Sequence, residues 1–202
     1  MKFKPSKIIA LGLNYIDHAK ELNMKIPDEP IIFLKPPSAV IGHLEKIIYP
    51  EGVKELHYEA ELAIVVKKRA KNVPPEDAYR YILGYTCFND VTARDIQRKD
   101  IQWTRAKSFD TFCPVGPEIV SNIDPSNLKI EAYLNDKLVQ SSNTKNMIFK
   151  VPEIFSFISK IMTLEEGDII ATGTPPGVGP MKRGDKIEVR IEKIGSLINF
   201  VE

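Results

Sequence analysis

The segment from Tyr58 to Val66 constrains the fold most, because it joins two acidic residues to an apolar run. Its second half, from Leu62 onward, has the aliphatic and β-branched composition of a buried strand, whereas Glu59 and Glu61 lie in its first half. Side chains two positions apart on a strand leave the same face, so both carboxylates should point in one direction. A solvated strand face also carries acids at this spacing, but this run is too apolar for an exposed strand. Two anions on a buried face need a cation.

A third acid ends another apolar stretch. Residues 85–89 have the composition of a strand that begins after Gly84 and ends beside Asp90. An uncompensated carboxylate is costly at the end of a buried strand. Glu59, Glu61 and Asp90 therefore form a candidate metal site. Three carboxylates without a cysteine ligand favour Mg²⁺ or Mn²⁺ over zinc, and Ca²⁺ is a third option.

The rest of the chain predicts short strands joined mainly by hairpins. Apolar or alternating runs predict strands at residues 7–12, 31–34, 128–134, 168–172, 185–191 and 196–201. Prolines and apolar spacing predict helices at residues 15–22, 74–81, 92–101 and 151–162. Asn135-Asp136-Lys137 has the composition of a hairpin turn. Strands outnumber helices, and hairpin signals outnumber βαβ signals, so we expect a β-rich α+β fold.

Length and charge narrow the class of protein. The 202 residues fit one domain, or one domain with a small extension. The contents of 43% hydrophobic and 27% charged residues are close to the averages for soluble globular chains. Lys and Arg number 28 against 27 Asp and Glu, and without a basic stripe this balance argues against a nucleic-acid partner. No apolar leader follows Met1 and no long uncharged apolar run occurs, so we expect no membrane association and a cytoplasmic location. Cys87 and Cys113 form no CxxC pair and are expected to be reduced thiols.

Three further residues are candidates for catalysis. His18 and Glu21 are three apart on a predicted helix, so an imidazole and a carboxylate can share a face as a base and its orienting partner. Lys107 lies between an alanine and an aromatic cluster, and by residue type alone a snorkelling surface lysine is the commoner case. His43 and His57 are expected to be supporting or structural residues rather than catalytic ones.

The glycine-rich stretch at residues 171–180 lacks the residue order of a nucleotide-binding loop, and its prolines remove amide donors. Two interpretations stay open. The stretch either brings backbone amides and Thr174 to a carboxylate, or forms an ordinary tight turn.

Six short blocks follow one another over nearly the whole chain: GLNYIDH at 12–18, FLKP at 33–36, YEAEL at 58–62, NDVTARD at 89–95, AKSFD at 106–110 and TGTP at 172–175. In order and spacing they resemble the fumarylacetoacetate hydrolase family in its short form. That form includes acylpyruvate hydrolases, oxaloacetate decarboxylases or tautomerases, and hydroxyhepta-diene-dioate isomerases.

The resemblance implies a fold of the fumarylacetoacetase C-terminal type, a mixed β-sandwich or roll with a few peripheral helices, and a homodimer. It implies a divalent metal on the three carboxylates already paired. The family's conserved lysine falls on Lys107, and its His/Glu dyad falls on His18 and Glu21. Contacts to the substrate carboxylate fall on Arg94, Gln97 and Thr174. Residues 1–50 would be a small N-terminal extension that supplies a strand, a helix and pocket loops, and residues 51–202 would be the catalytic domain.

A small 2-oxo acid could chelate such a metal through its carboxylate and keto oxygen. Our principal expectation is hydrolysis of a carbon–carbon bond in an acylpyruvate-type 2,4-dioxo acid, giving pyruvate and a carboxylic acid. Glu21 would orient His18, which would activate water, while Lys107 or Arg94 would neutralise the developing charge.

Three alternatives remain within the family, namely oxaloacetate decarboxylation, keto–enol tautomerisation and dioate isomerisation. The dyad favours hydrolysis or tautomerisation, because decarboxylation needs no base. A non-enzymatic module that holds a structural Ca²⁺ is a distant alternative, since calcium ligands usually come from one flexible loop.

Overall fold

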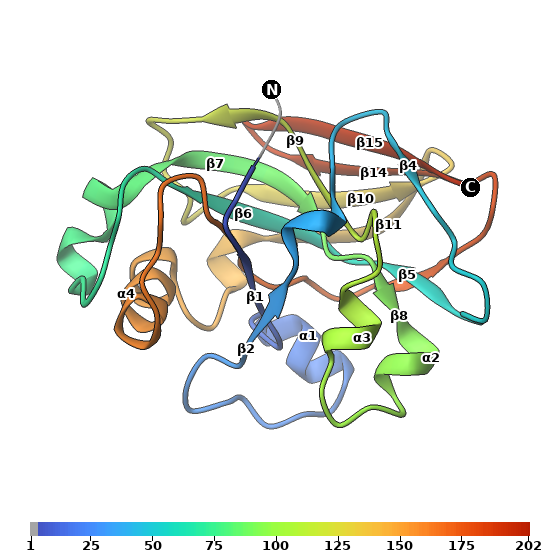
Figure 1. Cartoon of the computed structure of the whole chain (residues 1–202), viewed down its shortest axis with the longest axis horizontal. Coiled ribbons are helices and arrows are strands. Elements are labelled where there is room, and N and C mark those ends of the chain that lie inside the picture. Colours follow the sequence, from blue (N-terminus) through green and yellow to red (C-terminus); the bar gives the residue numbers. More distant parts are fainter. Residues whose placement is uncertain (1–3) are drawn as a thin grey trace.

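A seven-stranded mixed sheet forms the centre of the structure, a computed structural model that describes residues 4–202 (Figure 1). In spatial order its strands are β2 (Ile32–Lys35), β1 (Ile8–Leu11), β12 (Ile169–Ala171), β6 (Ala60–Val66), β7 (Ile82–Asn89), β9 (Cys113–Val120) and β3 (Val40–Ile41). β1 runs parallel to β12 and β3 parallel to β9, and the other neighbours are antiparallel. The expected β-rich α+β class is confirmed.

Two smaller sheets complete the strand framework. The five-stranded sheet contains β11 (Lys137–Asn143), β10 (Lys129–Leu134), β14 (Lys186–Ile191), β15 (Gly195–Val201) and β4 (Lys46–Ile47), and the three-stranded sheet contains β13 (Gly179–Met181), β5 (Leu56–Tyr58) and β8 (Thr92–Ala93). Leu62 and Ile64 of β6 share one buried cluster with Ile130 and Val189 of the five-stranded sheet. Because strand side chains alternate between faces, Glu61 and its neighbours on that face point away from this cluster.

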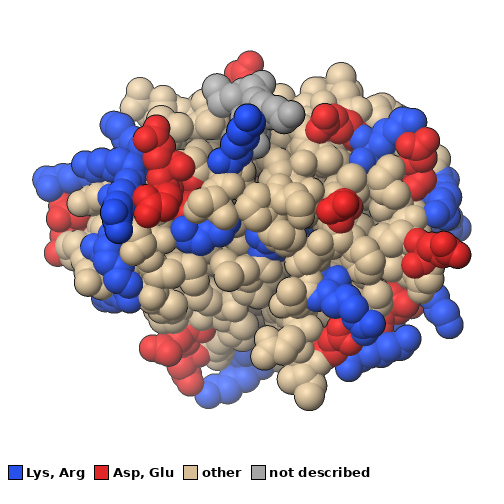
Figure 2. All heavy atoms as spheres, viewed as in Figure 1, with Lys and Arg blue, Asp and Glu red and all other residues tan. Residues whose placement is uncertain are grey.

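Short helices cover the periphery. They are α1 (Ile16–Glu21), α2 (Arg94–Gln97), α3 (Thr104–Lys107) and α4 (Val151–Ile161), with 3-10 segments at Pro37–Ala39, Pro75–Tyr81 and Thr144–Asn146. Figure 1 shows α1, α3 and α2 in the lower centre and right of the view, with α4 apart from them at the left. In the same view, Figure 2 shows acidic and basic side chains mixed toward both sides of this face. Within residues 4–202 no helix is both long and apolar enough to cross a membrane.

Two of the predicted helices are wrong in type or extent. Residues 75–81 form a 3-10 segment, and α2 covers only Arg94–Gln97 of the helix expected at 92–101. Thr92 and Ala93 instead form β8, because β5 offers them a strand partner that local propensity does not reveal.

The glycine expected to precede a strand lies inside it. Gly84 belongs to β7, where a Cβ atom would come within 2.7 Å of the carbonyl oxygen of Val120. Glycine therefore allows β9 to approach closely.

The hairpin prediction is confirmed. Asn135 and Asp136, the two residues between β10 and β11, have φ angles of 50° and 66°. Positive φ at both central positions is the signature of a type I′ turn, and Asn and Asp tolerate it well. The division of the chain at residue 50 stays a prediction, although strands from both sides of it pair in the same sheets.

Asp168 ties the chain before β1 to the start of β12. Its carboxylate accepts hydrogen bonds from the backbone N–H groups of Ser6, Lys7 and Glu165, and it pairs with the ammonium of Lys7. Burial alone would raise the pKa of Asp168, but these donors hold it below its usual value of 3.8.

We expect Asp168→Asn to lower the free energy of unfolding by about 3 kcal/mol, because an amide nitrogen would face donors that now reach a carboxylate. The folded protein binds fewer protons here than the unfolded chain does. This stabilisation is therefore present above pH 3.8 and is lost as the pH falls through the lower folded-state pKa. Urea denaturation of both proteins at pH 7 and at decreasing pH measures the difference. A constant difference down to pH 2 would contradict the assignment.

Candidate active site

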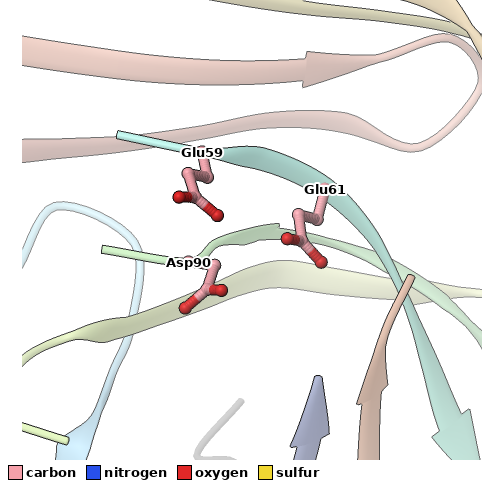
Figure 3. Close-up of side chains that lie close together, drawn as sticks. All are labelled: Glu59, Glu61 and Asp90. Atoms are coloured by element: carbon pink, nitrogen blue, oxygen red, sulfur yellow. The ribbon is translucent and has the colours of Figure 1, made fainter. Parts of the chain in front are cut away.

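Three buried carboxylates meet where the β5–β6 connection passes the end of β7. Ligand oxygens of Glu59, Glu61 and Asp90 all lie within 4.8 Å of one another. In Figure 3 the carboxylates of Glu59 and Glu61 point to the same side of the chain, toward that of Asp90. The structure thus brings the three predicted metal ligands together.

The two glutamates do not belong to one continuous strand. β5 ends at Tyr58 and β6 begins at Ala60, so Glu59 occupies the break between them. Its backbone N–H donates to Oδ1 of Asn89 at 3.0 Å, and its carbonyl accepts from the N–H of Asp90 at 2.9 Å. These bonds join the break to the end of β7 and keep Glu59 beside Asp90.

Glu61 gives the clearest sign that the cluster fits a cation. Its Oε2 accepts a hydrogen bond from the N–H of Gly173 at 2.7 Å, whereas its buried Oε1 has no partner among the described residues. Burial, followed by the charges of Asp90 and Glu59, raises the pKa of Glu61 well above its usual range. A divalent ion would pair Oε1 and offset this repulsion, and an all-oxygen donor set suits Mg²⁺ or Mn²⁺. The residues present therefore fit a hard divalent cation.

Positive side chains surround the outer edge of the cluster. Nζ of Lys107 donates to Asp90 Oδ2 at 2.6 Å and to Glu59 Oε2 at 3.0 Å, and the guanidinium of Arg94 contacts the other oxygen of Glu59. Burial alone would raise the pKa of Glu59, but Lys107 and Arg94 hold it well below its usual range. Burial alone would lower the pKa of Lys107, but the charges of Asp90 and Glu59 raise it above its usual value. Lys107 is 2% exposed, so the surface-lysine alternative is wrong.

Lys35 is a site residue that the sequence analysis did not single out. It is 1% exposed, and its ammonium contacts Asp90 Oδ1 and donates to the carbonyl oxygens of Val91 and Phe112, at 3.2 and 2.7 Å. The signal in the sequence that could have identified Lys35 is its position at the end of an apolar run, immediately before Pro36. Lys35 and Lys107 thus hold one oxygen each of Asp90.

We expect Lys35→Met to cost about 3–5 kcal/mol of folding free energy, because it leaves a buried carboxylate and two carbonyls without their donor. The urea midpoint of the purified variant measures the loss. Lys46→Met is the matched control, since Lys46 pairs with Glu202 on the surface, where an ion pair contributes about 1 kcal/mol or less. Equal midpoints for the two variants would contradict a role for Lys35 in holding Asp90.

The predicted dyad forms on α1. Nδ1 of His18 lies 2.8 Å from Oε2 of Glu21, which leaves Nε2 of the ring as the second nitrogen. His18 is buried and Glu21 is 42% exposed in its side chain. Oε1 of Glu21 also accepts from the N–H of Gly177 at 3.1 Å, so the dyad is tied to the glycine-rich loop.

The loop agrees with the backbone part of the first interpretation, because the N–H groups of Gly173 and Gly177 donate to carboxylates of the protein itself, whereas Thr174 does not. Gly173 has φ +93°, and a Cβ atom there would lie 2.8 Å from Cβ of Asn14, so only glycine fits. Asn14 braces the loop by donating to the carbonyl of Thr172 at 2.7 Å. The hydroxyl of Thr174 donates to the carbonyl of Ala60 at 2.9 Å.

A pocket of about 370 Å³ opens beside Glu59 of the cluster. One part of its wall is polar and contains six of the predicted site residues, namely His18, Glu59, Arg94, Gln97, Lys107 and Thr174. The other part is apolar and contains Leu22, Met24, Ile31, Phe33 and Trp103. The rings of Phe33 and Trp103 meet edge to face, 5.4 Å between centroids. Six of the predicted site residues therefore share one cavity. The other three lie outside its lining: Glu21 bonds to His18, Asp90 bonds to Lys107, and Glu61 lies beside Glu59. Their catalytic roles stay predictions.

Gln97 and His57 orient Arg94. Oε1 of Gln97 accepts from the guanidinium of Arg94, and Nε of Arg94 lies 3.4 Å from Nδ1 of His57. Burial, followed by the charge of Arg94, lowers the pKa of His57 to about 4, so its ring is neutral near pH 7 and can accept this bond. His57 thus lies behind the pocket wall, as expected for a supporting residue.

Comparison with known proteins gives a consistent set of relatives. Residues 7–202 match the family described as fumarylacetoacetate (FAA) hydrolase C-terminal. An uncharacterized protein of Methanocaldococcus jannaschii is 62% identical over 100% of this chain and 85% of its own length. The mitochondrial oxaloacetate tautomerase Fahd2a of Rattus norvegicus is 44% identical over 98% of this chain and 67% of its own. The crystal structure of 5-carboxymethyl-2-hydroxymuconate delta-isomerase from Mycobacterium smegmatis matches with a TM-score of 0.93 and 46% identity, over 98% of this chain and 79% of that one.

Proposed function

The chain belongs to the fumarylacetoacetate hydrolase family, and from this premise we propose that it catalyses the divalent-metal-dependent keto–enol tautomerisation of a small 2-oxo acid such as oxaloacetate. The observation that carries the proposal is the His18–Glu21 pair, because its imidazole lines the same pocket as Glu59 of the carboxylate cluster. A rat relative named as an oxaloacetate tautomerase and a mycobacterial structure named as an isomerase support proton-transfer chemistry over bond cleavage.

The reaction moves one proton from C3 of the substrate to the oxygen on C2, and no atom is gained or lost. A divalent ion on Glu59, Glu61 and Asp90, when bound, supplies Lewis-acid polarisation of a 2-oxo group. Glu21 holds Nδ1 of His18, which leaves Nε2 to remove the C3 proton and return a proton to the oxygen.

The other polar side chains bind and orient the substrate. Oε1 of Gln97 is occupied by Arg94, so its Nε2 is left to donate to a substrate carboxylate. Lys107 brings a buried positive charge to the side of the pocket where the enolate develops. The apolar wall around Trp103 limits access of water to that charge.

Acylpyruvate hydrolysis is the second candidate, because the same dyad could activate a water molecule. The observation that favours it is the apolar wall of Leu22, Met24 and Ile31, which could pack against an acyl group. Decarboxylation is less well supported, since loss of CO₂ needs no base at C3.

The substrate test uses purified protein with and without Mg²⁺. Enol-oxaloacetate, acetylpyruvate and fumarylpyruvate are offered separately, with enol absorbance followed and products separated by chromatography. We expect Mg²⁺-dependent acceleration of enol loss from oxaloacetate without release of CO₂. Cleavage of the acylpyruvates with no effect on oxaloacetate would overturn the tautomerase proposal in favour of hydrolysis. Inactivity toward all three, with intact Mg²⁺ binding, would favour a non-enzymatic metal-binding module.

A further inference from the structure

Arg98 is a cation of the pocket that the proposed mechanism does not use. It follows α2, and its backbone N–H donates to the carbonyl of Arg94 at 3.2 Å, so the two arginines are one helical turn apart. Residues four apart lie on the same helix face, and both arginines line the pocket. The side chain of Arg94 is 17% exposed and that of Arg98 is 62% exposed. Arg94 therefore lies at the floor beside Glu59, and Arg98 lies at the mouth.

The guanidinium of Arg98 has one protein partner and still has donors to offer. One of its nitrogens pairs with Oε2 of Glu55 at 2.9 Å on the exposed rim. A guanidinium has five N–H donors in a planar fork, and this fork matches a carboxylate better than an ammonium does. Leu22, Met24 and Ile31, which also line the pocket, offer no donor.

The spacing of the two arginines suits a short dicarboxylate. A 2-oxo acid that bound with its C1 carboxylate and keto oxygen at the cluster would direct its other end toward the mouth. In a four-carbon acid the two carboxyl carbons are roughly 4 Å apart, across carbon–carbon bonds of about 1.5 Å. One helical turn advances about 5.4 Å. The separation of the two carboxylates is therefore comparable with the spacing of the two arginines along the helix.

We propose that Arg98 binds the carboxylate distal to the 2-oxo group and so makes the pocket selective for short 2-oxo dicarboxylates over 2-oxo monocarboxylates. This inference rests on the proposed function for the position of the 2-oxo end. It assigns specificity to a residue at the rim, separate from the side chains that move the proton.

The kinetic test compares Arg98→Gln and Arg98→Lys with wild type on two tautomerising substrates. Oxaloacetate carries the distal carboxylate, and phenylpyruvate replaces it with an apolar ring. We expect Arg98→Gln to raise KM for oxaloacetate about 10- to 100-fold, the range for a charge-assisted hydrogen bond, with kcat and the KM for phenylpyruvate little changed. Arg98→Lys should recover part of the loss. Lys99→Gln is the control, because Lys99 is exposed and outside this pocket.

A binding measurement tests the contact between Arg98 and the distal carboxylate independently of turnover. Trp103 is the single tryptophan and lines the pocket, so its fluorescence in the presence of Mg²⁺ reports Kd for 3,3-difluoro-oxaloacetate and for pyruvate. We expect Arg98→Gln to weaken the dicarboxylate and to leave pyruvate unchanged. Equal weakening of both ligands, or of neither, would overturn the assignment. If wild type turns over neither substrate, the proposed function fails, and this ratio of Kd values still decides whether Arg98 binds a distal carboxylate.

Discussion

Glu61→Gln is expected to lower kcat/KM by about three orders of magnitude, because it removes a charged ligand on which the Lewis-acid contribution of about 4 kcal/mol depends. The same substitution should not destabilise the metal-free protein. Burial together with Asp90 and Glu59 raises the pKa of Glu61, so the charged carboxylate is unfavourable there without a cation. A neutral amide should therefore leave the metal-free melting temperature unchanged or higher.

The measurement is thermal melting with and without Mg²⁺, alongside turnover. In wild type, Mg²⁺ at a hundredfold excess over its Kd should add about 2.7 kcal/mol of stability, and Glu61→Gln should lose this increment. Glu188→Gln is the matched control, because Glu188 is also a buried acid but pairs with Arg190 and Ser196 on the five-stranded sheet. If Glu61→Gln melts lower and its folded fraction keeps full activity, the ion is structural and the catalytic interpretation is wrong.

The metal cluster was accessible from sequence because its signals are local. Period-two spacing placed Glu59 and Glu61 on one side of the chain, and the end of an apolar run placed Asp90 at a buried edge. The break between β5 and β6 was not accessible, because it depends on a hydrogen bond from Glu59 to a side chain on β7. The three predicted ligands therefore lie together in the structure, although the single strand expected to carry Glu59 and Glu61 is divided into β5 and β6.

Elements that depend on distant partners were missed. β9 (Cys113–Val120) is a full strand of the central sheet, yet its two prolines and Gly116 hide any strand pattern. Lys35 looks like an ordinary strand-end lysine until Asp90 and the carbonyl of Phe112 are placed around its ammonium. The kind of reaction was hardest to infer. A metal ion on this cluster would serve hydrolysis and tautomerisation alike. The identities of the relatives shift our preference toward tautomerisation.

His18→Gln is expected to lower kcat by about 100- to 10,000-fold, the usual contribution of a general base, while leaving binding intact. Glutamine fills similar space but cannot take up a proton. The Mg²⁺-dependent rise in melting temperature and the quenching of Trp103 by 3,3-difluoro-oxaloacetate should both persist, because neither depends on proton transfer. Steady-state rates of enol loss measure the effect.

Two further variants of α1 distinguish a catalytic role of the His18 ring from a structural role of the helix. Glu21→Gln keeps the imidazole but loses the charged partner of Nδ1, so a smaller loss is expected, about tenfold. Asp17→Asn weakens the contacts that α1 makes with Ser142 and Asn146 without touching the ring, and should reduce stability more than turnover. If His18→Gln kept full turnover while Asp17→Asn abolished it, α1 would act only as a wall of the pocket. Tautomerisation needs a base, so that result would mean that another group moves the proton and would overturn the role proposed for His18.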